Sequence, residues 1–309
     1  MDRRRRRTRA LGGLAAALIA AGAVPAADVP LAAMRWLSLG AEPVALLTLE
    51  PAECLAMPVD PGLTRSVEIG RAAFRTPLLL GGQAARAGIS CESCHRAGRA
   101  NPAFRFPGVS GPPGTADVTS SLFSSHRGNG VDDPRPIPDL SGPRAGLKVA
   151  PGDVAPFVRG LIVEEFDGPE PSPAVLQGLA DYVRALGPQA CPTTSARAIT
   201  VQALMSDARR AIAAAQSVED PRTAAFLVTA ARARLFLLDE RYARLRPERA
   251  ALRRADRDLA HIAQALREGR PEARAQLARW QARTPVLEAR LRRAERGSLL
   301  DSKTLAAVL

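Results

Sequence analysis

The chain of 309 residues lacks the long apolar runs of a membrane protein. Beyond residue 27, no apolar stretch approaches the roughly 20 residues that a helix needs to cross a bilayer. Lysine is also scarce, since it occurs only at Lys148 and Lys303, and the basic character therefore comes almost entirely from arginine. We expect no transmembrane segment in the mature chain.

The formal net charge of +12 is unevenly distributed. Residues 1–27 hold six arginines and one aspartate, and residues 200–309 hold 22 basic against 13 acidic residues. The central residues 28–199 hold 15 basic and 17 acidic residues and are close to neutral. The excess charge thus lies at the two ends of the chain. This distribution gives no reason to expect a nucleic acid as partner.

The first 27 residues have the pattern of a secretory signal peptide. Arginines precede an apolar run from Leu11 to Val24, and Val24-Pro25-Ala26 supplies small residues for cleavage. The run of about 14 residues is too short to span a bilayer. We therefore expect an exported protein, periplasmic in a bacterium, that is soluble after cleavage.

Cysteine and histidine are few, but one pentapeptide combines them. Cys91-Glu92-Ser93-Cys94-His95 has the C-x-x-C-H pattern of c-type haem attachment. Two thiols at this spacing add to the two vinyl groups of haem, and the next histidine binds the iron. A zinc site would need two further ligands, and the only other histidines are His126 and His261. The motif predicts one covalent haem c, held by Cys91 and Cys94, with His95 as axial ligand.

The other two cysteines, Cys54 and Cys191, lie outside the motif. Cys54 precedes the haem region and Cys191 follows the last helix expected in it. An oxidising compartment allows a disulfide between them. The alternative is two separate buried thiols, each packing as a small apolar side chain.

Composition divides the mature chain near residue 195. Proline and glycine are dense from Pro58 to Pro192, whereas alanine, leucine and arginine dominate from Thr200 onward. We expect a mostly α-helical protein, with a cytochrome c-like haem domain at 28–195 and a helical hairpin or bundle at 196–309. The haem domain should have helices near 63–74, 154–165 and 174–186, and a long turn-rich segment over 98–151. In the tail, helix starts are expected at Asp220-Pro221, Arg246-Pro247 and Arg270-Pro271.

The residues around the motif resemble a known family. Ile69-Gly70-Arg71-Ala72-Ala73-Phe74, Leu80-Gly81-Gly82 and Gly88-Ile89-Ser90 before Cys91 resemble the haem-motif region of bacterial di-haem cytochrome c peroxidases and methylamine-utilisation haem proteins. Residues 179–186 resemble the last helix of many cytochrome c domains. Those peroxidases carry two C-x-x-C-H motifs and this chain carries one. Their catalytic cycle therefore does not transfer to this chain alone.

The sixth position on the iron decides what such a haem could do. No methionine occurs between Cys94 and Leu204, which argues against the ordinary downstream methionine ligand. His126, in the long turn-rich segment, is the favoured distal ligand, and Met57 is the alternative from upstream of the motif. A third possibility is an open or water-filled position.

Two functions follow from these alternatives. An electron-transfer protein is the favoured one, and no residue is then expected to be catalytic. A peroxidase-like haem enzyme or a sensor with an exchangeable sixth site is the alternative. A redox partner protein is expected in the first case, and the basic helical tail could dock it or contact a membrane surface.

Overall fold

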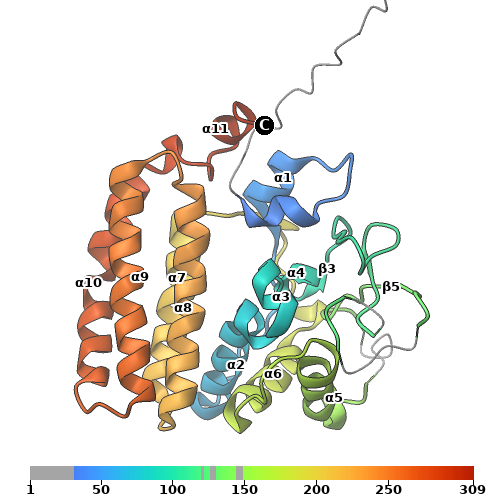
Figure 1. Ribbon diagram of the computed structural model, residues 1–309, viewed down its shortest axis with the longest axis horizontal. Helices are drawn as coiled ribbons and strands as arrows, with labels where there is room; N and C mark the ends of the chain where they lie inside the picture. The colour runs from blue at the N-terminus through green and yellow to red at the C-terminus, as the bar shows by residue number, and fades with distance from the viewer. Residues whose placement is uncertain (1–30, 120–121, 126–129, 144–148) are drawn as a thin grey trace, which may run out of the picture.

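The computed structural model describes residues 31–119, 122–125, 130–143 and 149–309. In these ranges the protein is mostly helical, with short strands paired in two-stranded sheets. Figure 1 shows four long helices, α7 to α10, standing side by side, with the shorter helices α2 to α6 next to them. The prediction of a mostly α-helical protein is confirmed. The predicted signal peptide lies outside the described residues.

The helices α2 (Pro61–Phe74) and α6 (Pro173–Ala185) form where the sequence predicts helices. Each begins with a proline behind a polar residue that caps the first turn. Asp60 accepts a hydrogen bond from the N–H of Leu63 at 2.7 Å, and Ser172 is the corresponding cap of α6. Both helices are therefore fixed in position at their N-termini by local hydrogen bonds.

The helices α2 and α6 cross at two glycines, Gly70 and Gly178. A Cβ atom added to Gly70 would lie only 1.8 Å from the carbonyl oxygen of Gly178. A Cβ atom on Gly178 would lie 2.7 Å from the carbonyl oxygen of Ser66. Only a residue without a side chain allows two helix backbones to approach this closely. Helix α2 precedes the C-x-x-C-H segment, whose Cys91 and Cys94 side chains pack against the hydrophobic core.

Between these helices the described chain is largely irregular, as the sequence predicts. The short helices α3 (Gly82–Ala87) and α4 (Cys91–Cys94) follow α2. Short strand pairs join β2 (His95–Arg96) to β3 (Arg99–Ala100), and β4 (Thr115–Ala116) to β5 (Arg135–Pro136). The helix expected from Val154 begins there as α5 (Val154–Gly160) and continues as a π-helical turn, Leu161–Glu165.

The tail forms an antiparallel helical bundle. Its long helices are α7 (Val201–Ser217), α8 (Pro221–Arg241), α9 (Arg246–Arg267) and α10 (Ala273–Arg293). The starts predicted at Asp220-Pro221 and Arg246-Pro247 are confirmed, whereas α10 begins two residues later than the prediction at Pro271. No helix among the described residues is long and apolar enough to cross a membrane.

Helix α10 contains a proline in its interior, a position where proline usually breaks a helix. Pro285 has no N–H, so the carbonyl oxygen of Gln281 loses its usual partner four residues on. The hydroxyl of Thr284 donates a hydrogen bond to that oxygen at 2.7 Å. The buried Thr284 side chain thus replaces the missing backbone donor, and the helix continues to Arg293.

The hydrophobic core is continuous across the composition change near residue 195. Helix α2 packs against α7 and α8 as well as α6, and a single cluster of buried apolar side chains runs through all four. The strand β1 (Leu49–Pro51) pairs with β6 (Ala196–Ala198), so the chain before the C-x-x-C-H motif is bonded to the start of the bundle. The tail therefore shares a core with the region of this motif.

In the segment before β1, the short helix η1 (Ala32–Trp36) lies beside α8, and α1 (Pro43–Thr48) packs against the C-terminal helix α11 (Ser302–Ala306). Glu240 of α8 accepts a hydrogen bond from the N–H of Ala32 at 3.2 Å. Burial raises the pKa of this carboxyl to about 7, and Asp239 adds to the effect, while the Ala32 N–H and the cations Arg241 and Arg35 oppose it.

We predict that Glu240→Gln stabilises the protein at alkaline pH. Because the pKa is about 7 in the folded state and 4.5 ordinarily, ionisation of Glu240 opposes folding above pH 7 and not below pH 4.5. Glutamine keeps the acceptor for Ala32, and the expected gain at pH 8 is on the order of 2 kcal/mol, vanishing at pH 4. Urea unfolding at both pH values measures it. The exposed Glu219→Gln variant is the control, and equal curves for the two variants at pH 8 would refute the prediction.

Candidate functional site

The short helix α4, which carries the C-x-x-C-H motif, is fixed at its start by its own serines. The N–H of Ser90 donates to the Oγ atom of Ser93 at 3.1 Å, and the Ser90 side chain accepts from the backbone of Ser93 in return. This reciprocal capping box satisfies donors that a helix N-terminus leaves free. Cys91 and Cys94 are three residues apart in α4 and share a face of this helix, whereas His95 follows the helix with the extended φ of −111° and begins β2.

The two thiols of the motif are free and lie against the hydrophobic core. Burial raises the pKa of Cys91 and of Cys94 to about 12, so both remain uncharged thiols at neutral pH. A thiolate redox site requires the opposite shift.

The imidazole of His95 is oriented by a backbone carbonyl. Its Nδ1 atom lies 3.0 Å from the carbonyl oxygen of Pro138, and because a carbonyl only accepts, Nδ1 carries the proton. The Nε2 atom then keeps its lone pair. Burial lowers the pKa of His95 to about 4, so the ring is neutral at physiological pH. Such a ring presents one nitrogen for a metal and uses the other for orientation.

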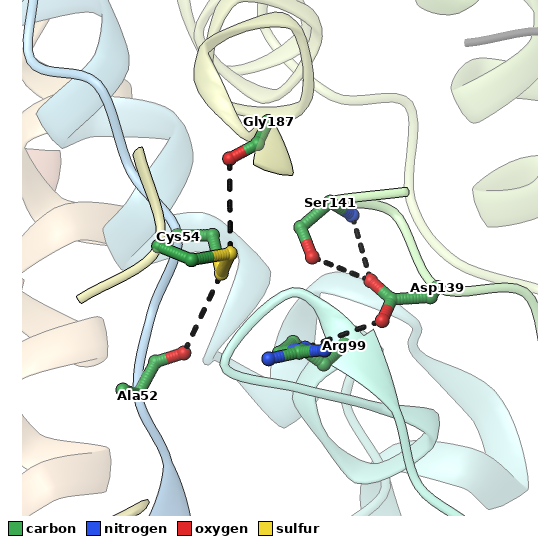
Figure 2. The surroundings of a disulfide bond; sticks show 7 residues. Ala52, Cys54, Arg99, Asp139, Ser141 and Gly187 are labelled. Atoms are coloured by element: carbon green, nitrogen blue, oxygen red, sulfur yellow. Dashed lines mark hydrogen bonds and ion pairs between the residues drawn. A yellow bond between two sulfur atoms is a disulfide. The ribbon is translucent and has the colours of Figure 1, made fainter. Parts of the chain in front are cut away.

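The loop that carries Pro138 is anchored next to the motif. The N–H of Leu140 donates to the carbonyl oxygen of Gly98 at 3.0 Å. Arg99 pairs with Asp139 at 3.2 Å, and Asp139 also accepts from Ser141, as Figure 2 shows. These contacts fix the residue that orients His95. Sequence reasoning did not identify Pro138, because its role depends on a carbonyl that any residue has.

The disulfide predicted between Cys54 and Cys191 is present. It joins residues separated by 137 positions and lies near the Arg99–Asp139 pair (Figure 2). The carbonyl oxygen of Cys54 also accepts a hydrogen bond from the N–H of Gly187 at 3.0 Å. The bridge thus closes the segment that contains the motif at the end of α6. A crosslink over so long a loop restricts the unfolded chain strongly.

Glu92, a variable position of the motif, has two partners that the sequence did not reveal. One carboxylate oxygen accepts from the N–H of Ala97 at 3.1 Å, where the backbone turns with a left-handed φ of 52°. The other accepts from Nε of Arg75 at 2.8 Å. Glu92 therefore fixes the turn after His95 and joins it to α2. The only sign of this role in the sequence was that the residue inside the motif is acidic.

Arg75 is the centre of a buried ionic cluster. Its side chain is 5% exposed and pairs with Glu53 at 3.0 Å and Asp207 at 3.1 Å, in addition to Glu92. Burial alone would raise the pKa of Asp207, but the guanidinium of Arg75, with other arginines, lowers it to about 2. Glu53 also accepts from the hydroxyl of Tyr182 at 2.7 Å. One arginine thus connects the motif, the disulfide-bearing segment and the bundle.

Of the two predicted distal ligands, only Met57 lies among the described residues. His126 lies outside the described residues. Met57 follows the disulfide-bearing segment and its side chain is 42% exposed. Both assignments remain predictions. No three His, Cys, Asp or Glu side chains within the described ranges gather as ligands for a metal ion, and Cys91, Cys94 and His95 accordingly do not converge on one point.

Protein-family models, curated proteins and solved structures were compared with this chain, and none of them matches it. Any proposal about its function therefore rests on its own residues.

Proposed function

We propose that the protein is an exported mono-haem c-type cytochrome that transfers electrons, with haem attached to Cys91 and Cys94 and bound through His95. The carrying observation is the His95 ring directly after the two thiols, whose Nδ1–H donates to the carbonyl oxygen of Pro138 and leaves the Nε2 lone pair free to bind a metal. A ring oriented by a backbone carbonyl is typical of metal-ligating histidines.

The donor set fits a haem better than a chelated ion. Attachment at the porphyrin edge needs two thiols that lie apart from the histidine, and a tetrahedral zinc site needs ligands that converge. The half-buried, uncharged thiols of Cys91 and Cys94 agree with the first arrangement. The disulfide agrees with an oxidising compartment, where c-type haem is attached.

Covalently bound haem supplies one-electron chemistry, and the chain sets its environment. Pro138 keeps the tautomer of His95, and Glu92 fixes the turn that follows it. The Arg75 cluster supports that turn from behind. These residues would hold His95 in one orientation when haem is bound.

The basic bundle is the proposed docking surface for a redox partner. Exposed arginines gather on α9, among them Arg246, Arg253, Arg254 and Arg257. A positive surface of this kind raises the encounter rate with an acidic partner, and the effect falls with salt.

The test of haem attachment is expression of the full chain with a c-type haem maturation system. We expect the purified protein to carry one haem that survives denaturation, and Cys91→Ala with Cys94→Ala to carry none. The double variant Cys54→Ala with Cys191→Ala loses the disulfide but keeps both motif thiols, and we expect it to retain covalent haem. A wild-type protein without haem, or a motif variant that still holds it covalently, would refute the proposal.

The sixth iron position separates the electron carrier from the haem enzyme or sensor. A carrier should be six-coordinate and low-spin in both oxidation states and should not bind carbon monoxide. Spectra of His126→Ala and Met57→Ala identify the ligand, since only the loss of the true ligand opens the position. Carbon monoxide binding by the wild-type protein would instead favour the enzyme or sensor.

A further inference from the structure

A cavity of about 750 Å³ lies between the haem motif and the bundle. Its walls come from η1 and α1, from the α2–α4 region and from α8. Its size falls within the range of about 300–1,000 Å³ that is usual for small-molecule sites. Nothing in the proposed electron transfer uses this space.

The cavity is separate from the thiol face of the motif. Ser90, Glu92 and Ser93 line it, whereas Cys91, Cys94 and His95 do not. It therefore lies behind α4, and a haem attached to the thiols would be on the other side of this helix.

Five cavity-lining arginines have no carboxylate partner within 4.0 Å among the described residues, and three of these, Arg96, Arg234 and Arg241, have backbone partners instead. Their guanidinium groups donate instead to backbone oxygens, and Arg234 has a single such partner, the carbonyl of Arg75. A guanidinium has several N–H donors in a fixed fork, so much of this donor capacity is unused. Burial lowers the pKa of Arg241, but only to about 10, and it stays cationic at neutral pH.

The acidic residues of the cavity are mostly engaged with other arginines. Asp207, which attracts Arg234 from outside the cavity lining, is bonded to Arg75 and Arg210. The lining carboxylates and their partners are Glu50 with Arg197, Glu92 with Arg75, Asp239 with Arg249 and Arg253, and Asp256 with Arg232. Glu240 has a raised pKa of about 7 and is therefore partly neutral. The cavity thus keeps an uncompensated positive charge.

The same cavity presents apolar surface. Trp36, Leu47 and Leu235 are buried in its walls, and Leu78 and Phe236 line it with 55% and 58% of their surface exposed. Large exposed apolar side chains beside a cavity indicate a place where an apolar group binds. Unpaired guanidinium groups and apolar walls together match a molecule that has both an anionic head and an apolar body.

We propose that this cavity binds an amphipathic anion, with its carboxylate or sulfonate head on Arg234 and its apolar body against Trp36, Leu235 and Phe236. Arg96 and Arg241 add to the positive potential around the head. Arg234 and Arg241 each have one backbone partner, which leaves most of their donors free, and Arg234 is the anchor because it is the less buried of the two. The binding does not depend on the redox role of the haem.

Isothermal titration calorimetry of the purified mature protein tests this with three probes. Decanoate carries the head and the chain, acetate only the head, and decyltrimethylammonium the same chain with a positive head. We expect one decanoate per chain, no measurable acetate binding and much weaker binding of the cation. Equal binding of the cation and decanoate, or no decanoate binding, would overturn the proposal.

Variants locate the site. Arg234→Gln should weaken decanoate binding at least about tenfold, because a charge-assisted hydrogen bond is lost. Phe236→Ala, at a largely exposed position that does not threaten folding, should weaken it several-fold. Arg283→Gln, at an exposed arginine of α10, is the matched control and should bind as the wild type does. Unchanged binding in both the Arg234 and the Phe236 variants would rule out this cavity.

Discussion

Replacing Gly70 by alanine is expected to destabilise the protein by about 3 kcal/mol or more, since overpacking usually costs 1–3 kcal/mol and here the obstacle is backbone. The new methyl group would lie 1.8 Å from the carbonyl oxygen of Gly178, and no side-chain movement relieves that clash. The helices α2 and α6 would have to separate, which would open the core that supports α4. Urea unfolding followed by far-UV circular dichroism measures the change.

The matched control is the same substitution at Gly160. This glycine lies in α5 with helical dihedrals of φ −57° and ψ −43°, and a Cβ atom there meets nothing within 4 Å. Gly160→Ala should stabilise the protein by about 0.5–1 kcal/mol, because alanine restricts the unfolded chain. Opposite signs for the two substitutions are the expected result. If the Gly70→Ala variant unfolds at the same urea concentration as the wild type, the close approach of α2 and α6 at Gly70 is wrong.

Replacing Arg75 by methionine is expected to cost about 3–5 kcal/mol at pH 7, the usual effect of removing one partner from a buried ionic cluster. The change leaves the carboxylates of Glu53, Glu92 and Asp207 close together without their shared cation. Methionine has a similar length, so the lost charge and donors cause most of the effect. Denaturant unfolding at pH 7 gives the magnitude.

The pH dependence distinguishes this electrostatic effect from a simple packing defect. In the wild type the Asp207 pKa is lowered from 3.8 to about 2, so its ionisation stabilises the fold above pH 3.8 and this contribution is lost as the pH falls towards 2. Without Arg75, protonation of the three carboxylates removes the repulsion between them. The difference between variant and wild type should therefore shrink between pH 7 and pH 3. A constant difference would show that packing, and not charge, is responsible.

Arg283→Met provides the comparison for Arg75→Met. Arg283 is 68% exposed and pairs with Asp258 at 3.4 Å, and such surface pairs contribute about 0–1 kcal/mol. We expect its unfolding curve to overlie that of the wild type. A large loss of stability here would mean that removal of any arginine is harmful, and the special role of Arg75 would be refuted.

The helix starts were predictable because their signals are local. The prolines after Asp60, Ser172 and Asp220 set the first turn, and the polar residue before each caps it. The start of α10 was misplaced by two residues because Pro271 and Glu272 lie in the turn before that helix. The disulfide could also be anticipated, since only Cys54 and Cys191 remain after the motif is assigned.

The composition change near residue 195 predicted the onset of the bundle but not how the bundle relates to the rest. Ion pairs and apolar contacts from α2 reach α7, and the Arg75–Asp207 pair spans 132 positions. Helical periodicity indicates which face of a helix is apolar, but it does not identify the face that it packs against. The continuous core is therefore a result of packing.

By itself, the sequence determined the features that depend on neighbouring residues: the C-x-x-C-H motif from Cys91 to His95, the capped helices and the cysteines available for a disulfide. Only the tertiary structure decided that Pro138 orients His95, that Arg75 connects the motif to the bundle and that Gly70 meets Gly178. Each of these depends on contacts between distant segments, some of them through backbone atoms that every residue has. Such contacts form when the whole chain packs, and no local pattern of side chains encodes them.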